Sequence, residues 1–110
     1  MKVDFKGYGE NVATFIADSA VTAGNIVKVT DNFKVEKAAS GDKFIGVCIG
    51  VRGGYAAVQT SGYVEVPASG TVTVGKTALA AASATAVTAS QSGVVYDVIY
   101  TDENKVGFIL

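Results

Sequence analysis

Short stretches of alternating or continuous apolar residues run along the whole chain, and glycine or Asp/Asn turns separate them about every ten residues. Valine, threonine and tyrosine, which favour strands, fill most of these stretches. Phe33, Val35 and Lys37 share one face of an extended chain, and the two charged residues between them share the other. This alternation predicts a half-buried strand.

The same pattern predicts about ten short strands with short turns, which is typical of an all-β barrel or sandwich. The strands are expected to be mostly antiparallel, and the pattern leaves barrel and sandwich both open. In the region of 77–89, alanines favour a helix but Ser83 and Thr85 interrupt them, so two short strands around a turn at Ser83 are preferred to a short helix. The other expected strands are residues 12–17, 26–30, 33–37, 44–51, 55–60, 63–66, 71–74, 94–100 and 105–110.

Two of these elements carry more specific expectations. Asp31-Asn32 separates two strands and tolerates the positive φ of a two-residue hairpin turn. Residues 44–51 are apolar throughout apart from two glycines, which predicts a central strand covered on both sides. Gly46 and Gly50 within it indicate a bulge or a close backbone approach.

Two pairs of short segments resemble each other across the two halves of the chain. Residues 21–25 resemble residues 72–76, and residues 43–47 resemble residues 105–108. Because such short matches arise easily in a chain rich in valine, threonine and glycine, chance is preferred to a repeated unit as their explanation.

Composition narrows the possible chemistry. The chain has 110 residues, which suits one domain, and its 49% of hydrophobic residues indicates a globular protein. It has no histidine, which excludes a His-based triad and imidazole metal ligands. Nine basic residues are scattered against ten acidic ones, and Arg52 is the only arginine, so we expect no nucleic-acid partner. The longest apolar run stops at Arg52 after eight residues, and the first residues are charged, so we expect no membrane partner and no secretion signal.

Candidate chemical groups have ordinary structural interpretations. Cys48, the only cysteine, lies in the most hydrophobic run and is expected to be a buried thiol without catalytic activation. Gly70 and Gly75-Lys76-Thr77 meet the bare spacing of a phosphate-binding loop, but the intervening residues alternate like a strand. Lys43 suggests a lipoyl or biotinyl carrier, yet it leads directly into an apolar strand. The carboxylates fall mostly in turns and form no motif, although 102–104 could loosely hold a cation. We therefore expect no enzyme activity, no cofactor and no metal.

Several glycine- and valine-rich stretches stand out along the chain. They are residues 20–27, 44–48, 55–66, 74–76, 94–97 and 105–110. These stretches resemble the small capsid decoration, or head cement, proteins of tailed bacteriophages. The likeness covers about residues 18 to 110, and its motifs are patterns and not chemical signatures.

This resemblance implies a structural virion protein. Such a protein is made in the host cytoplasm, binds the outer surface of an assembled phage head and stabilises contacts between major capsid subunits. The resemblance also implies a homo-oligomer, with a trimer favoured. It divides the chain into an N-terminal arm, residues 1–11, and a single β-rich decoration domain, residues 12–110.

The arm supplies the candidate capsid contacts Val3, Phe5 and Tyr8, which alternate roughly with charged residues and flexible glycines. An extended arm of this kind can add a strand to a sheet edge of the capsid. A frayed terminus or an edge strand of the domain itself explains the same pattern equally well.

A second hypothesis is a small β-barrel binding module or adaptor for a carbohydrate or protein ligand, without catalytic activity. Its binding platforms would be tyrosines, although the lack of tryptophan weakens sugar stacking. The candidate platforms are Tyr8, Tyr55, Tyr63, Tyr96 and Tyr100.

Overall fold

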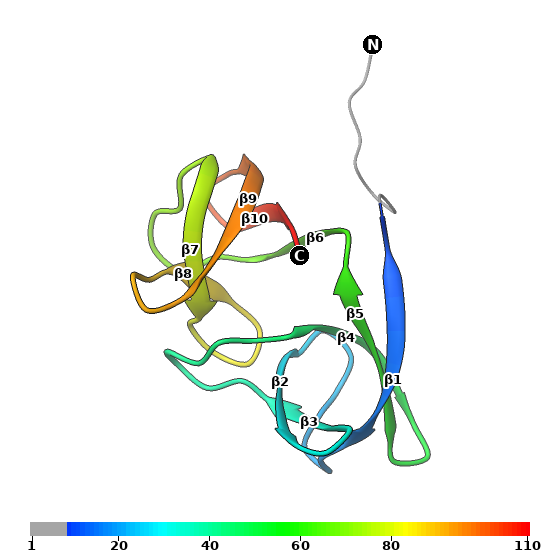
Figure 1. Cartoon of the computed structure of the whole chain (residues 1–110). Coiled ribbons are helices and arrows are strands. Elements are labelled where there is room, and N and C mark those ends of the chain that lie inside the picture. The colour runs from blue at the N-terminus through cyan, green and yellow to red at the C-terminus, as the bar shows by residue number, and fades with distance from the viewer. Residues whose placement is uncertain (1–8) are drawn as a thin grey trace.

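A computed structural model describes residues 9–110, and within this range the chain folds into ten strands without a helix (Figure 1). The all-β prediction is therefore confirmed. The strands are β1 (Asn11–Ala17), β2 (Ile26–Asp31), β3 (Lys34–Lys37), β4 (Gly46–Arg52), β5 (Tyr55–Ser61), β6 (Tyr63–Pro67), β7 (Gly75–Ala81), β8 (Val87–Ala89), β9 (Val94–Thr101) and β10 (Lys105–Ile109).

The first five strands close into a barrel in the order β1-β3-β2-β4-β5. β1 closes it by pairing antiparallel with β5 on one side and parallel with β3, at Ile16 and Ala17, on the other. Alternate residues of these strands point inward, as the period of a strand requires. Together with Val21 from the connection between β1 and β2, they form a small apolar interior that contains Val27, Val35, Cys48, Ala56 and Val58.

The last five strands form a second sheet in the order β6-β10-β9-β7-β8, which lies beside the barrel (Figure 1). We call it the C-terminal sheet. Its end strands are not paired along their length, but Ala68, just after β6, makes a parallel bridge with Val87 of β8.

The C-terminal sheet has the strand order of the barrel. When each strand is matched with the one five places later, β3-β2-β4-β5-β1 becomes β8-β7-β9-β10-β6. The Ala68 to Val87 bridge then corresponds to the parallel β1–β3 closure of the barrel. Val35 occupies the place of Val87, because the amide of Asp18 donates to the Val35 carbonyl as that of Ser69 donates to the Val87 carbonyl.

Bulges and cores repeat as well. The β4–β5 pairing skips Ile49, and the β9–β10 pairing skips Ile99 at the matching position. The six interior residues of the barrel correspond to six buried residues of the C-terminal sheet, which are Val72, Leu79, Val87, Val98, Val106 and Phe108. The two halves therefore repeat one topology, which corrects the preference for a chance resemblance. The match of 21–25 with 72–76 has the correct alignment, whereas that of 43–47 with 105–108 is wrong, because β4 corresponds to β9.

A shared apolar core joins the two halves. Ile26, Ala38 and Phe44 of the barrel half belong to the same buried cluster as the interior of the C-terminal sheet. The Phe44 ring lies 5.4 Å from the Tyr96 ring and 6.1 Å from the Phe108 ring, measured between centroids. Such aromatic contacts add to the area that they bury. Residues 38–45 are therefore the joint of the molecule.

Backbone hydrogen bonds fix this joint. Ala81 of β7 donates to the Asp42 carbonyl over 2.9 Å and accepts from the Gly41 amide over 2.8 Å. The Asp42 carboxylate accepts hydrogen bonds from Lys28 Nζ at 2.7 Å and from the Ala39 amide at 2.9 Å. These contacts, the Lys28 hydrogen bond first, lower the pKa of Asp42. The Asp42 hydrogen bond in turn raises the pKa of Lys28.

Some local expectations are corrected at the first hairpin. Asp31 pairs with Lys34, so the turn residues are Asn32 and Phe33, and the positive φ of 58° is at Phe33 instead of the predicted Asp31-Asn32 pair. A register shift between Val29 and Asp31 moves the turn by one residue. Phe33 is consequently 79% exposed and does not share the buried face of Val35.

Two other strand expectations are corrected. Residues 71–74 pair with no strand among residues 9–110, because they connect β6 to β7. The predicted strand at 44–51 is not covered on both sides, since β4 begins at Gly46 and half of the Ile49 side chain faces solvent. The predicted close approach at Gly46 is confirmed, because a Cβ there would collide with the Gln59 carbonyl. The two strands around a Ser83 turn are confirmed as β7 and β8.

Truncation of Phe44 tests the joint. We expect Phe44→Ala to lower the free energy of unfolding by about 3–5 kcal/mol, because it leaves a cavity in the core shared by both halves. The same change at exposed Phe33 should cost about 0.5 kcal/mol or less. Urea denaturation of the two variants measures both values. Equal losses would show that the halves are not held by this core.

The Asp42 carboxylate tests the joint electrostatically. Its lowered pKa means that it stabilises the fold above its unfolded-state pKa, and that this stabilisation is lost as pH falls through the folded-state pKa. We expect Asp42→Asn to unfold more easily at neutral pH and to show a weaker decline in stability between about pH 6 and about pH 3 than the wild type. Denaturation midpoints across that range measure this, and parallel pH profiles would contradict it.

Candidate functional site

The groups that were considered for catalysis or cation binding, Cys48 and Asp102, make hydrogen bonds within the fold. Cys48 is 1% exposed inside the barrel, as expected, and its thiol donates to the Gly50 carbonyl at 3.4 Å. Asp102 Oδ1 accepts from the amides of Asn104 and Lys105, and its Oδ2 accepts from the Tyr100 hydroxyl. These bonds, that from the Asn104 amide first, lower the pKa of Asp102. In the part of the chain from Gly9 onward, no group of three or more Cys, Asp or Glu side chains is placed to hold a metal ion.

Neither Lys76 nor Lys43 lies in the structure that a phosphate-binding loop or a lipoyl or biotinyl carrier requires. Gly75, Lys76 and Thr77 begin strand β7, where a phosphate-binding loop requires a helix. Lys76 Nζ donates to Asp97 Oδ1 at 2.8 Å instead of lying open to a phosphate. Lys43 is exposed in the joint, directly before buried Phe44, and not at the tip of a hairpin.

The tyrosines do not form a common platform. Tyr63 is 7% exposed, and Tyr96 packs between Phe44 and Phe108 in the joint, where burial raises its pKa. Tyr55 and Tyr100 are exposed, but they lie on β5 and β9, one in each half of the molecule. A binding platform built from several tyrosines is therefore not assembled among the described residues.

The predicted capsid contacts Val3, Phe5 and Tyr8 lie outside the described residues, as does most of the predicted arm. The last residue of that arm, Asn11, begins β1 and donates through its side chain to Ser61 Oγ at 2.9 Å. This residue is thus part of the barrel sheet.

The most distinctive surface in the described part of the chain is the outward face of β1, β5 and β4, which we call the barrel face. Strand register places its side chains in two neighbouring rows. The first row contains Ile16, Tyr55 and Arg52, and the second contains Thr14, Ala57 and Gly50. Ile16 and Tyr55 are 45% and 57% exposed, so apolar surface faces solvent here.

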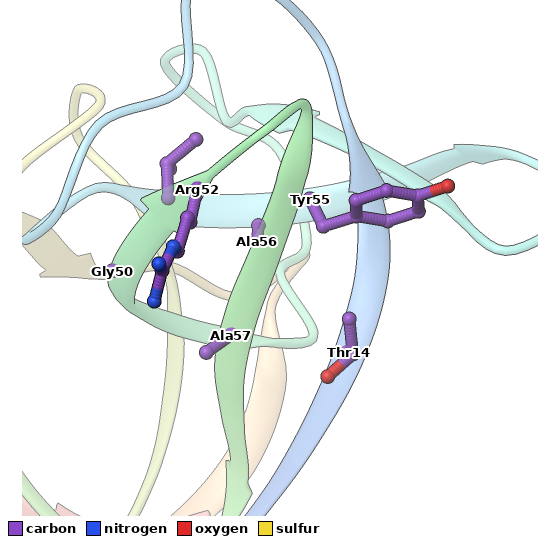
Figure 2. Close-up of a pocket in the computed structure, with 7 residues that line it drawn as sticks. Thr14, Gly50, Arg52, Tyr55, Ala56 and Ala57 are labelled. Carbon is purple, nitrogen blue, oxygen red and sulfur yellow. The ribbon is translucent and has the colours of Figure 1, made fainter.

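The second row forms the floor of a shallow depression of about 330 Å³ (Figure 2). Its floor is low because Gly50 and Ala57 carry little or no side chain. Figure 2 shows the Tyr55 ring extending from β5 across β1, while Arg52 lies on the other side of β5. The depression is therefore bordered by an aromatic ring and a guanidinium group.

The charge of this face is unbalanced. β1, β4 and β5 contain no aspartate or glutamate, and Arg52 is their one charged residue. Among residues 9–110, Arg52 makes no ion pair and no side-chain hydrogen bond. This arrangement can bind an anionic and apolar group.

The equivalent face of the C-terminal sheet is closed by its own side chains. Gly107 takes the place of Ala57, and a Cβ there would collide with the Tyr63 hydroxyl. That hydroxyl donates to Glu65 Oε2 at 2.8 Å, and Lys105 Nζ lies 3.3 Å from Glu65 Oε1. The Glu65 contact also raises the pKa of Lys105. One backbone arrangement thus carries a filled, charge-paired face in one half and an open face in the other.

The sequence by itself pointed to only some residues of the barrel face. Arg52 stood out as the only arginine and Tyr55 as a possible platform, but nothing linked them to each other or to Thr14. The signal that was available is the absence of acidic residues from 43 to 64, which spans β4 and β5. The third strand, β1, is too far along the sequence for any pattern to place it beside them.

Comparison of the sequence with models of protein families found no match, and a search of curated proteins found no relative. From Gly9 to the C-terminus, no helical segment has the length and apolar character needed to cross a membrane.

Truncation of Tyr63 and of Tyr55 tests which of the two equivalent faces stabilises the fold. We expect Tyr63→Ala to lower the free energy of unfolding by about 3 kcal/mol, because it uncovers Gly107 and breaks the contact with Glu65. We expect Tyr55→Ala to cost about 0.5 kcal/mol or less, since its ring is mostly in solvent. Urea denaturation measures both, and a large loss at Tyr55 would mean that the barrel face stabilises the fold.

Proposed function

We propose that this protein is a structural virion protein that binds the outer surface of an assembled tailed-phage head and stabilises contacts between major capsid subunits. The observation that carries the proposal is the barrel face, an exposed apolar surface with one cation and no carboxylate. Apolar surface exposed on a folded domain commonly marks an interaction site. The sequence resemblance to head cement proteins supplies the identity of the partner.

The build of the molecule suits this role. Antiparallel strands joined by a shared apolar core give a rigid body, and a rigid body loses little conformational entropy when it binds. Many copies on a symmetric lattice also gain from avidity, so each copy needs only a modest interface. The proposal includes a homo-oligomer, with a trimer favoured. Exposed apolar residues outside the barrel face offer surface for contacts between its copies. The three most exposed of these are Phe33, Val74 and Val95.

The alternative is a small β-barrel binding module or adaptor for a carbohydrate or protein ligand. Sugar binding usually relies on exposed aromatic rings, and two of the four described tyrosines are instead packed into the interior or largely covered. Binding to a capsid requires an exposed contact surface but no aromatic platform. We therefore place the capsid proposal first.

Co-sedimentation with phage heads tests the proposal. We expect the protein to sediment with assembled heads that lack it and to remain in the supernatant with loose capsid subunits, because the lattice supplies several subunits at once. Bound heads should also release their DNA at a higher temperature than bare heads. Binding to neither heads nor subunits, together with clear hits on a glycan array, would replace this proposal with the binding module.

A further inference from the structure

The barrel face has the properties of a docking site that the molecule does not fill itself. In the C-terminal sheet, the equivalent depression is filled by Tyr63 and its charge is paired between Glu65 and Lys105. In the barrel, Val12 takes the place of Tyr63, because it pairs with Gln59 as Tyr63 pairs with Ile109. Valine is too short to cover Ala57, so the depression stays open.

The charge of the face indicates the chemistry of an occupant. Arg52 is the one charged residue of β1, β4 and β5, and within residues 9–110 it has no anionic partner. A guanidinium group binds a carboxylate through two parallel hydrogen bonds. A partner that supplies a carboxylate would balance this charge, whereas a basic partner would be repelled.

The shape of the face indicates the form of an occupant. The floor at Gly50 and Ala57 admits a small apolar side chain, and the Tyr55 ring offers an apolar wall beside it (Figure 2). Tyrosine and arginine are the residues most often found at the energetic centre of protein interfaces. In addition, the pairing of β2 with β4 stops at Val47, so among the described strands none pairs with the far edge of residues 49–52. An extended segment can lie along such an edge.

We propose that the depression on the barrel face receives an extended segment of the capsid surface, which places a carboxylate against Arg52 and a small apolar side chain over Ala57. This inference rests on the proposed function, since it takes the capsid as the partner. It adds the surface that docks and the acidic, apolar character of the segment that is recognised.

Binding to assembled heads that lack the protein tests the inference through four variants. We expect Arg52→Glu to weaken binding about tenfold or more, because it sets two negative charges against each other. Lys43→Glu makes the same charge reversal on an exposed residue outside the face and should change binding less than about twofold. Ala57→Phe fills the depression and should also weaken binding about tenfold. Ala89→Phe adds the same bulk at an exposed position on β8 and is its control.

Each outcome has a separate meaning. If the wild type binds heads and both barrel-face variants bind equally well, the docking site is wrong while the capsid function stands. If the wild type does not bind heads, the proposed function fails, and the capsid segment fails with it. If Arg52→Glu instead changes the oligomeric state in light scattering and leaves head binding intact, the face joins copies of this chain. Unfolding midpoints identify any misfolded variant, and Arg52→Glu decides alone if Ala57→Phe does not fold.

Discussion

The packing of Phe44 between the two halves is the contact on which the rest of the structure depends. Each half is a small set of short strands, and a chain segment of about 50 residues buries so little surface that its stability alone is marginal. The Phe44 ring joins Tyr96 and Phe108, and Ala81 ties the neighbouring backbone of Gly41 and Asp42 to β7. Two marginal units therefore become one domain with a continuous core.

The two halves share one topology but have different surfaces. Both halves keep the strand order, the bulge at Ile49 or Ile99 and six corresponding buried residues, because these positions determine whether the sheet closes. Outward positions are not under that constraint. In the C-terminal sheet they hold Tyr63 and Glu65 in a closed network, and in the barrel they leave an open apolar face with Arg52.

The barrel face is open, whereas the equivalent face of the C-terminal sheet is covered by its own side chains. This difference separates side chains that stabilise the fold from side chains that are available to a partner. A side chain that covers a depression contributes to stability, and its replacement by a shorter one gives up part of that stability. The barrel has such a shorter residue at Val12, and the nearby Arg52 makes no ion pair within residues 9–110. A partner that supplies a carboxylate and an apolar contact would explain both features. The capsid lattice is the partner that we propose.

Local patterns determined much of this architecture. The pattern of apolar and polar residues placed eight strands to within a few residues, and the interruptions at Ser83 and Thr85 were enough to predict the other two as a hairpin among alanines. The glycine at position 46 indicated a close backbone approach that the structure contains. These features follow from the sequence because strand period and turn preference act between residues that are close along the chain.

Other features were decided only by the tertiary structure. The turn at Asn32 and Phe33 moved by one residue because of a bulge opposite β3, and residues 71–74 alternate like a strand yet pair with no strand within residues 9–110. The barrel face likewise joins Thr14, Arg52 and Tyr55 from three strands. The sequence by itself determined an all-β fold of short strands without an evident catalytic motif. Closure of the sheet determined the barrel face, since only strand pairing sets which distant residues become neighbours.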